Sequence, residues 1–363
     1  MTRTCLAAIT FAGLFACGGS PAQPDAAIDA PPDAPPDAPP DAPPDAPPPL
    51  SVDEPPECAG DPLVARGGDL ALVVSALAIP TLQLSYDLDG NGMPDNKLAA
   101  ISSLSTDAIN AALAGGTLVL PIEIFDRDAD PDPCLKLALY RGSCATAGCN
   151  LTDAVPDTVV LDPTSIGPGG VPISRLRAMM TTGPGAIVSQ PGFLEVGLPI
   201  TDTLSLTLPI TVMRAEGTLA GAGTTAALSG LRVGGVMQAF RLDLIDAPLI
   251  PEIGAVPGDS ELDIIFANLL GPLLALPRLS GMTSCRTADI DVDQDGLEGF
   301  CDSDPDNDPK RVDTCIDGDG TIIHDGDGGV ALCTQATLNG VPRFKDGISA
   351  ALVFDAKAAT IAP

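Results

Sequence analysis

The order of apolar and polar residues predicts short β-strands. From Leu204 to Val212 an apolar residue occupies every second position, which is the period of a half-buried strand. Pro209 lacks an amide hydrogen, so this strand is expected at an edge or a bulge. Further strands are expected at residues 117–125, 135–140, 158–161, 187–198, 228–233 and 348–354, with Gly, Pro, Asn and Asp between them.

Helical spacing is confined to short stretches. Ser260 and Asp263 have the spacing of a capping box, which opens an apolar helix that Pro272 ends. A second helix is expected at residues 106–114 and a third at 235–245. The predicted fold class is therefore mainly β, an antiparallel sandwich-like domain with two or three short helices and an acidic insertion.

The first residues predict export and a lipid anchor. Residues 1–16 combine a basic start with an apolar run too short to span a bilayer, as in an export signal. The segment Leu14-Phe-Ala-Cys-Gly-Gly-Ser20 resembles a bacterial lipobox. The resemblance implies that Cys17 is lipidated and that acyl chains hold the protein in the outer membrane, at the cell surface.

Residues 17–57 are expected to form a disordered tether. Pro-Pro-Asp-Ala occurs four times in succession between residues 31 and 46. Proline fixes φ and removes amide donors, so this stretch favours extended polyproline II and cannot form a hydrophobic core. The β-rich domain is expected to follow over residues 58–363.

The cysteine count agrees with export. Besides Cys5 in the signal and Cys17, an even number remains, which suggests disulfides in an exported chain. Proximity in the sequence favours Cys144 with Cys149 and Cys315 with Cys333. The full set of disulfide candidates is Cys58, Cys134, Cys144, Cys149, Cys285, Cys301, Cys315 and Cys333.

Charge excludes one class of partner. The chain has 48 acidic and 18 basic residues, a net charge of -30, which repels phosphate backbones and excludes nucleic-acid binding. His324 is the single histidine and no C-x-x-C occurs, which disfavours zinc. The expected partners are the membrane, through the lipid anchor, and an unknown protein or other component of the envelope.

An acidic segment at residues 286–327 predicts calcium binding. Asp291, Asp293, Asp295 and Asp302 occupy positions 1, 3, 5 and 12 of a loop with glycine at position 6. This is the layout of an EF-hand-type calcium loop, in which position 7, here Leu297, offers its carbonyl oxygen. The segment resembles thrombospondin type 3 calcium repeats. The alternation continues through Asp304, Asp306 and Asp308.

A second, shorter loop has similar spacing. Asp87, Asp89, Asn91 and Asp95 supply oxygen atoms at positions 1, 3, 5 and 9, with Gly92 at position 6. The loop resembles the nine-residue calcium hairpins of some adhesion proteins. We expect it to bind Ca²⁺ with help from a remote carboxylate.

No enzyme motif is complete. Residues 258–262 resemble the nucleophile motif of a family of serine esterases, but the Asp-x-x-His partner of that family is absent. The whole chain resembles uncharacterised Gram-negative surface lipoproteins with a proline-rich stalk and a calcium-loop-bearing β domain. The expected function is a calcium-binding surface protein of structural or adhesive type, without catalysis. Two alternatives stay open: a carrier of an apolar ligand in a cavity of the β domain, and a hydrolase of unrecognised type.

Overall fold

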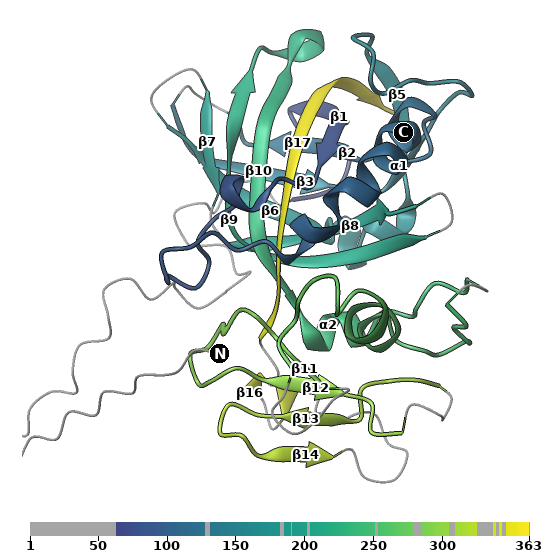
Figure 1. Cartoon of the computed structure of the whole chain (residues 1–363). Coiled ribbons are helices and arrows are strands. Elements are labelled where there is room, and N and C mark those ends of the chain that lie inside the picture. The colour runs from purple at the N-terminus through teal and green to yellow at the C-terminus, as the bar shows by residue number, and fades with distance from the viewer. Residues whose placement is uncertain are drawn as a thin grey trace, which may run out of the picture. The chain divides into compact units, whose positions relative to one another are not determined.

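The structure is a computed structural model of the whole chain (Figure 1). It describes residues 63–127, 131–181, 185–189, 191–201, 204–250, 253–278, 285–304, 309–324, 337–338, 341–342 and 346–362. The predicted signal, Cys17 and the predicted tether lie outside these residues. All described residues belong to one of the two units of the chain, Asp45–Pro363.

The main sheet is antiparallel for most of its extent and closes on itself. Around it the strands follow in the order β1, β2, β3, β6, β7, β9, β10, β17, and the ring closes because β17 also pairs with β1. These strands are β1 (Leu70–Ala78), β2 (Pro121–Phe125), β3 (Asp132–Leu139), β6 (Ser174–Met180), β7 (Ala186–Ser189), β9 (Ser205–Ala220), β10 (Ala227–Gln238) and β17 (Gly347–Ile361).

Three further strands extend this sheet. β8 (Gly192–Pro199) pairs with β6 and β9. The end of β17 pairs in parallel with β5 (Asp157–Leu161), which in turn pairs with β4 (Gly142–Cys144). The strand β17 therefore contacts three neighbours along its length, β10, β1 and β5.

One apolar cluster fills the closed sheet. Along β8 every second residue is buried, among them Leu194, Val196 and Leu198. Each such side chain contributes about 1.5–3 kcal/mol when it is fully removed from water. The predicted fold class, a mainly β, antiparallel domain with short helices, is confirmed, and most of the strands belong to one large sheet.

The expected strands occur with one difference, and one expected helix is partly wrong. Residues 187–198 form two strands, β7 and β8, instead of one. The helix expected at 235–245 is wrong in its first part, because β10 continues to Gln238 and only Ala239–Asp243 (α2) is helical. Gly235 lies between β9 and β17, and a side chain there would collide with the carbonyl oxygen of Thr211. Pairing on both sides outweighs the helical spacing.

Pro209 lies where one side of β9 has no ladder partner. The pairing of β9 with β10 begins at Ile210, so residues 205–209 pair only with β8. On the open side the amide of Thr207 donates to the carboxylate of Glu261, at 3.0 Å. The missing amide hydrogen of Pro209 therefore interrupts no pairing, as the edge prediction requires.

The helices are short. α1 (Ser102–Ala114) buries Ser105, Ile109 and Leu113 and ends before Gly115. The remaining helical segments are η2 (Leu82–Leu84), η3 (Lys97–Ile101), η4 (Pro163–Ser165), η5 (Pro168–Gly170), η6 (Gly223–Thr225) and the π-helix η7 (Leu262–Leu269). Within the described ranges, no helix has the length and apolar character that crossing a membrane requires.

The acidic segment forms a small sheet of its own. It consists of β11 (Arg286–Thr287), β12 (Gly299–Cys301), β13 (Thr314–Ile316) and β14 (Ile322–His324), all antiparallel. A separate hairpin contains β15 (Thr337–Leu338) and β16 (Val341–Pro342). Phe300 joins the apolar cluster of the main sheet, so the acidic segment is packed on its inner side.

Disulfides close two loops. Cys144 bonds to Cys149, as predicted, and Cys285 bonds to Cys301 at the entrance of the small sheet. Cys134 and Cys315 are also disulfide-bonded. Cys58 and Cys333, the other two candidates, lie outside the described residues.

Candidate cation-binding loops

The loop at residues 87–95 brings three carboxylates together. One oxygen atom each of Asp87, Asp89 and Asp95 lies within 4.8 Å of the others. Asp87 accepts from the amides of Gly90 and Gly92, both at 2.8 Å. These bonds wind the chain tightly and point the alternating side chains toward one centre.

Anchors on both sides hold this loop. The guanidinium groups of Arg214 and Arg232 lie over the Tyr86 ring, 5.0 and 4.4 Å from its centroid. Its hydroxyl donates to the carbonyl of Arg232 at 3.1 Å. A side chain at Gly234 would collide with this ring. On the other side, Asp95 accepts from the amide of Leu88 at 2.7 Å and so closes the loop.

Burial makes the ionised form of Asp95 unfavourable. Desolvation, together with the charges of Asp89 and Asp289, raises the pKa of Asp95 to about 6. Among the described residues no basic side chain forms an ion pair with Asp87, Asp89 or Asp95. The charge on this loop therefore lacks a counter-ion from those residues.

The loop at residues 291–297 has the same construction. One oxygen atom each of Asp291, Asp293 and Asp295 lies within 4.8 Å of the others. Asp291 accepts from the amides of Gln294, at 2.6 Å, and Gly296, at 3.1 Å. Gly296 has a φ of 111°, and a Cβ there would lie 2.6 Å from the carbonyl oxygen of Gly318, so position 6 requires glycine.

Two buried acids that the sequence did not indicate lie under this loop. Asp346 accepts from the amide of Val292 at 2.7 Å and from the amide of Glu298 at 3.0 Å, so its carboxylate clamps both ends of the loop. Glu298 in turn accepts from the amide of Asp346 at 3.2 Å. Asp346 has an exposed fraction of 0% and Glu298 of 6%.

The charges of Glu298 and Asp346 and those of the loop carboxylates act on one another. Desolvation, followed by the charge of Asp346, raises the pKa of Glu298 to about 8, and Asp293 and Asp295 add to the shift. Desolvation raises the pKa of Asp346 to about 7, with contributions from Asp291 and Asp293. Five carboxylates thus repel one another in a partly buried space.

No sequence signal marked these two residues. Glu298 stands at position 8 of the loop, which the calcium-loop pattern leaves open, and Asp346 is 44 residues beyond Asp302 in a short polar turn. Only the pairing of Ile290 with Gly347 places Asp346 beside the loop.

A short series of hydrogen bonds connects the two loops through β17. The amide of Lys97, just after the first loop, donates to the hydroxyl of Ser349 at 3.0 Å. That hydroxyl donates to Asp289, just before the second loop, at 2.6 Å. The side chains of Leu88 and Ile290 also lie in one apolar cluster. Both loops are therefore held by the first residues of β17.

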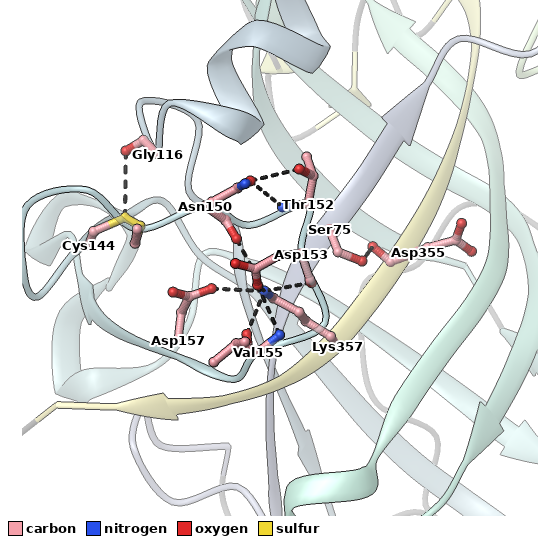
Figure 2. A network of polar contacts seen from close by, with 11 residues as sticks. Ser75, Gly116, Cys144, Asn150, Thr152, Asp153, Val155, Asp157, Asp355 and Lys357 are labelled. Atoms are coloured by element: carbon pink, nitrogen blue, oxygen red, sulfur yellow. Dashed lines mark hydrogen bonds and ion pairs between the residues drawn. A yellow bond between two sulfur atoms is a disulfide. The ribbon is translucent and has the colours of Figure 1, made fainter.

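In another loop, a lysine side chain provides the positive charge for the acidic groups. Lys357 on β17 lies among oxygen atoms of the loop that follows the Cys144–Cys149 disulfide (Figure 2). Its Nζ is 2.6 Å from the carbonyl of Val155, 2.9 Å from that of Asp153, 3.0 Å from the Asp153 carboxylate and 2.9 Å from the Asp157 carboxylate. Here an ammonium group neutralises an oxygen-rich loop.

The other predicted ligands lie in different places. Asn91 donates its amide to Asp89 and accepts from Met93, so it belongs to the first loop. The side chain of Leu297 is apolar and 43% exposed. The ligand that this residue offers is therefore its backbone carbonyl oxygen. Asp306 and Asp308 lie outside the described residues.

Asp302 is separated from the second loop by β12. It accepts from the amide of Asp304 at 3.0 Å, and the acids that act on its charge are Asp313 and Asp304. It does not belong to the group of Asp291, Asp293 and Asp295. The structure thus brings together positions 1, 3 and 5 of the predicted loop and places position 12 elsewhere.

The residues that resemble an esterase motif stabilise the start of a helix. Ser260 has an exposed fraction of 0%, and its hydroxyl accepts from the amide of Asp263 at 3.1 Å, the predicted capping bond. The hydroxyl is thus enclosed in the helix start.

Carboxylate oxygen atoms are suited to hard cations such as Ca²⁺ and Mg²⁺. No protein-family model, curated protein or solved structure matches this chain. The loops themselves are thus the basis for a functional conclusion.

Proposed function

We propose that this protein is a calcium-binding structural or adhesive protein of the cell surface, held in the outer membrane by a lipid on Cys17. One observation carries the calcium assignment. Each of two loops gathers three carboxylates within 4.8 Å, and each loop has the alternating Asp spacing of a calcium loop. Bound Ca²⁺ neutralises this charge and orders the loops.

Calcium suits these loops better than magnesium. Ca²⁺ accepts six to eight oxygen ligands in flexible geometry, whereas Mg²⁺ requires a near-ideal octahedron. Both loops are exposed on one side, where water completes the coordination. Side chains, backbone carbonyls and water in irregular arrangement therefore favour the larger ion.

Two cavities among the described residues give the carrier of an apolar ligand little support. A void inside the closed sheet has a volume of about 20 Å³ and is lined by side chains such as Leu139, Leu176 and Phe354. This volume holds about one water molecule. A groove of about 390 Å³ beside α1 includes Arg141 and Asp162 in its lining, so it is only partly apolar.

Thermal unfolding of the oxidised protein tests the proposal. The midpoint is measured in millimolar Ca²⁺, in excess chelator, and in Mg²⁺ at the same ionic strength. Calcium at about 100 times its Kd adds about 2.7 kcal/mol for each site, because it binds the folded chain only. We expect a higher midpoint in Ca²⁺ than in Mg²⁺ or chelator.

Equal midpoints in all three conditions would refute the calcium assignment. A rise of the same size in Ca²⁺ and Mg²⁺ would mean that the loops bind divalent cations without selectivity. The lipid anchor has its own test, because Cys17→Ser is expected to release the protein from the membrane fraction while its calcium-dependent midpoint stays the same.

A further inference from the structure

A second group of buried acids lies away from both loops, at the start of η7. Asp263 is in the first turn of this π-helix and has an exposed fraction of 2%. Its Oδ1 accepts from the side-chain amide of Asn268 at 3.1 Å. Its Oδ2 is enclosed and has no hydrogen-bond partner among the described residues.

Asp263 lies where η7 packs against α2 and β12, which end at Asp243 and next to Asp302. Asp302 acts most strongly on its charge, followed by Asp243 and Asp259. Each carboxylate oxygen of Asp259 already accepts a hydrogen bond, one from the amide of Lys310 at 2.6 Å and one from the amide of Val256 at 2.8 Å. Asp243 and Asp302 have exposed fractions of 4% and 9%.

Among the described residues, basic groups form no ion pair with Asp263 or Asp302. Arg311 is directed away, since its guanidinium donates to the carbonyl of Asp243 and pairs with the exposed carboxylate of Asp246. Lys310 acts on Asp302, but less than Asp304 and Asp313 do. Within the described part of the chain, neither Asp263 nor Asp302 forms an ion pair.

A buried carboxylate oxygen without a partner is strongly unfavourable unless a cation or a proton compensates it. We propose that Asp263 and Asp302, with Asp243 beside them, form a third site for a divalent cation of the Ca²⁺ type. The site lies between η7 and the end of β12, and it is independent of whether either loop binds a cation. Asp302 is then a ligand of this site and not of the loop at residues 291–297.

The third site is expected to be weaker than the loops. In the described residues, only the two loop groups have three carboxylate oxygens within 4.8 Å. Asp263 and Asp302 must therefore move closer around the ion, and backbone carbonyls and water complete the shell. This contraction lowers the affinity.

Counting bound ions tests the proposal. The full-length protein is dialysed to equilibrium against millimolar Ca²⁺, and bound calcium is measured for the wild type and for Asp263→Asn, Asp302→Asn, Asp295→Asn and Asp107→Asn. We expect Asp263→Asn and Asp302→Asn each to bind one ion fewer than the wild type. Asp107, exposed on α1, is the matched control and is expected to change nothing.

A second measurement guards against misfolding. In chelator, Asp263→Asn is expected to unfold at a higher temperature than the wild type, because an amide replaces one of two facing carboxylates. Such a result would show that Asp263→Asn is folded, so its lower ion count would reflect the lost ligand and not misfolding. Circular dichroism confirms the fold of each variant.

Three results would overturn the third site. Unchanged ion counts in Asp263→Asn would mean that the pair holds a proton. A loss in Asp302→Asn alone would return Asp302 to the loop at residues 291–297. No bound calcium in the wild type would remove this site together with the proposed function. In contrast, a loss in Asp295→Asn with unchanged counts in Asp263→Asn leaves the proposed function in place.

Discussion

The role of each carboxylate in this protein depends on the charge beside it. Asp153 and Asp157 face the ammonium group of Lys357, and hydrogen bonding to Lys357 lowers the pKa of Asp153. Asp346, in contrast, is buried beside the acids of the second loop, and burial, together with the charges of Asp291 and Asp293, raises its pKa. The same residue type thus has a cationic partner within the chain at one place and faces other acids at another.

Asp346 provides a test at the residue scale. Asp346→Asn keeps the shape of the side chain but leaves one oxygen to accept from Val292 and Glu298, so the loop loses one of its two clamps. Groups that orient metal ligands typically contribute 10–100-fold to affinity. We expect a calcium affinity at least 10-fold lower by isothermal titration calorimetry. An affinity equal to that of Asp107→Asn would show that the clamp does not matter.

Lys357 provides the opposite test. Lys357→Met leaves several loop oxygens, including the 14%-exposed carboxylate of Asp157, without their cation. Removing one partner of a largely enclosed ion pair costs about 1–3 kcal/mol here. Denaturant unfolding is expected to show the same loss in Ca²⁺ and in chelator. A loss that Ca²⁺ abolishes would mean that calcium replaces the lysine.

At the scale of elements, β17 organises the molecule. In Figure 1 this strand, in yellow, extends from the acidic segment along β10 and β1. Asp346, just before β17, accepts from the amide of Val292 in the second loop. Ser349 in β17 donates its amide to Asp289 before that loop and accepts from the amide of Lys97 after the first loop. The element that closes the main sheet therefore also supports both candidate calcium loops.

Ser349 tests this arrangement. Ser349→Ala removes the acceptor of the Lys97 amide and a donor to Asp289, and unsatisfied buried groups cost about 1–3 kcal/mol. Ser75 on β1 is the matched control, because its hydroxyl also donates to β17, at the carbonyl of Asp355, but at an exposed position. We expect chemical denaturation to show a clear loss for Ser349→Ala and less than about 0.5 kcal/mol for Ser75→Ala.

The calcium dependence of the Ser349 variant separates two explanations. If the serine supports the loops, Ser349→Ala also lowers the midpoint gained on adding Ca²⁺. An unchanged gain would mean that Ser349 stabilises the sheet alone.

At the scale of the whole molecule, the net charge of -30 makes pH a sensitive variable. Burial raises the pKa of several carboxyl groups above their ordinary value of about 4. These are Asp95 to about 6, Asp263 and Asp346 to about 7, and Glu261 and Glu298 to about 8. Without cations the folded state therefore holds more protons than the unfolded state between these limits.

The sign of the pH dependence follows. A raised folded-state pKa stabilises the fold at low pH, and this contribution is lost as the pH rises from about 4 to about 8. We expect the unfolding midpoint in chelator to fall between about pH 5 and pH 8. The proposed calcium sites require deprotonated carboxylates, so in Ca²⁺ the fall is expected to be smaller or absent. A midpoint in chelator that rises over this range would contradict the shifts.

The sequence by itself determined the local features. Alternation placed most strands, including β9 with its open side at Pro209, because a period of two depends only on neighbouring residues. The spacing of aspartate and glycine placed positions 1, 3 and 5 of both loops, because a tight turn brings alternate side chains together. Ser260 capped η7 for the same local reason.

Only the tertiary structure decided the long-range features. Residues 235–238 became strand because β9 and β17 pair with them from both sides, which helical spacing does not reveal. Asp346 reached the second loop through the pairing of Ile290 with Gly347, and β12, which packs against η7, separates Asp302 from that loop. Closure of the sheet likewise required β17 to meet β1 across more than 270 residues. Such contacts depend on the free energy of the assembled core and leave no periodic trace in the chain.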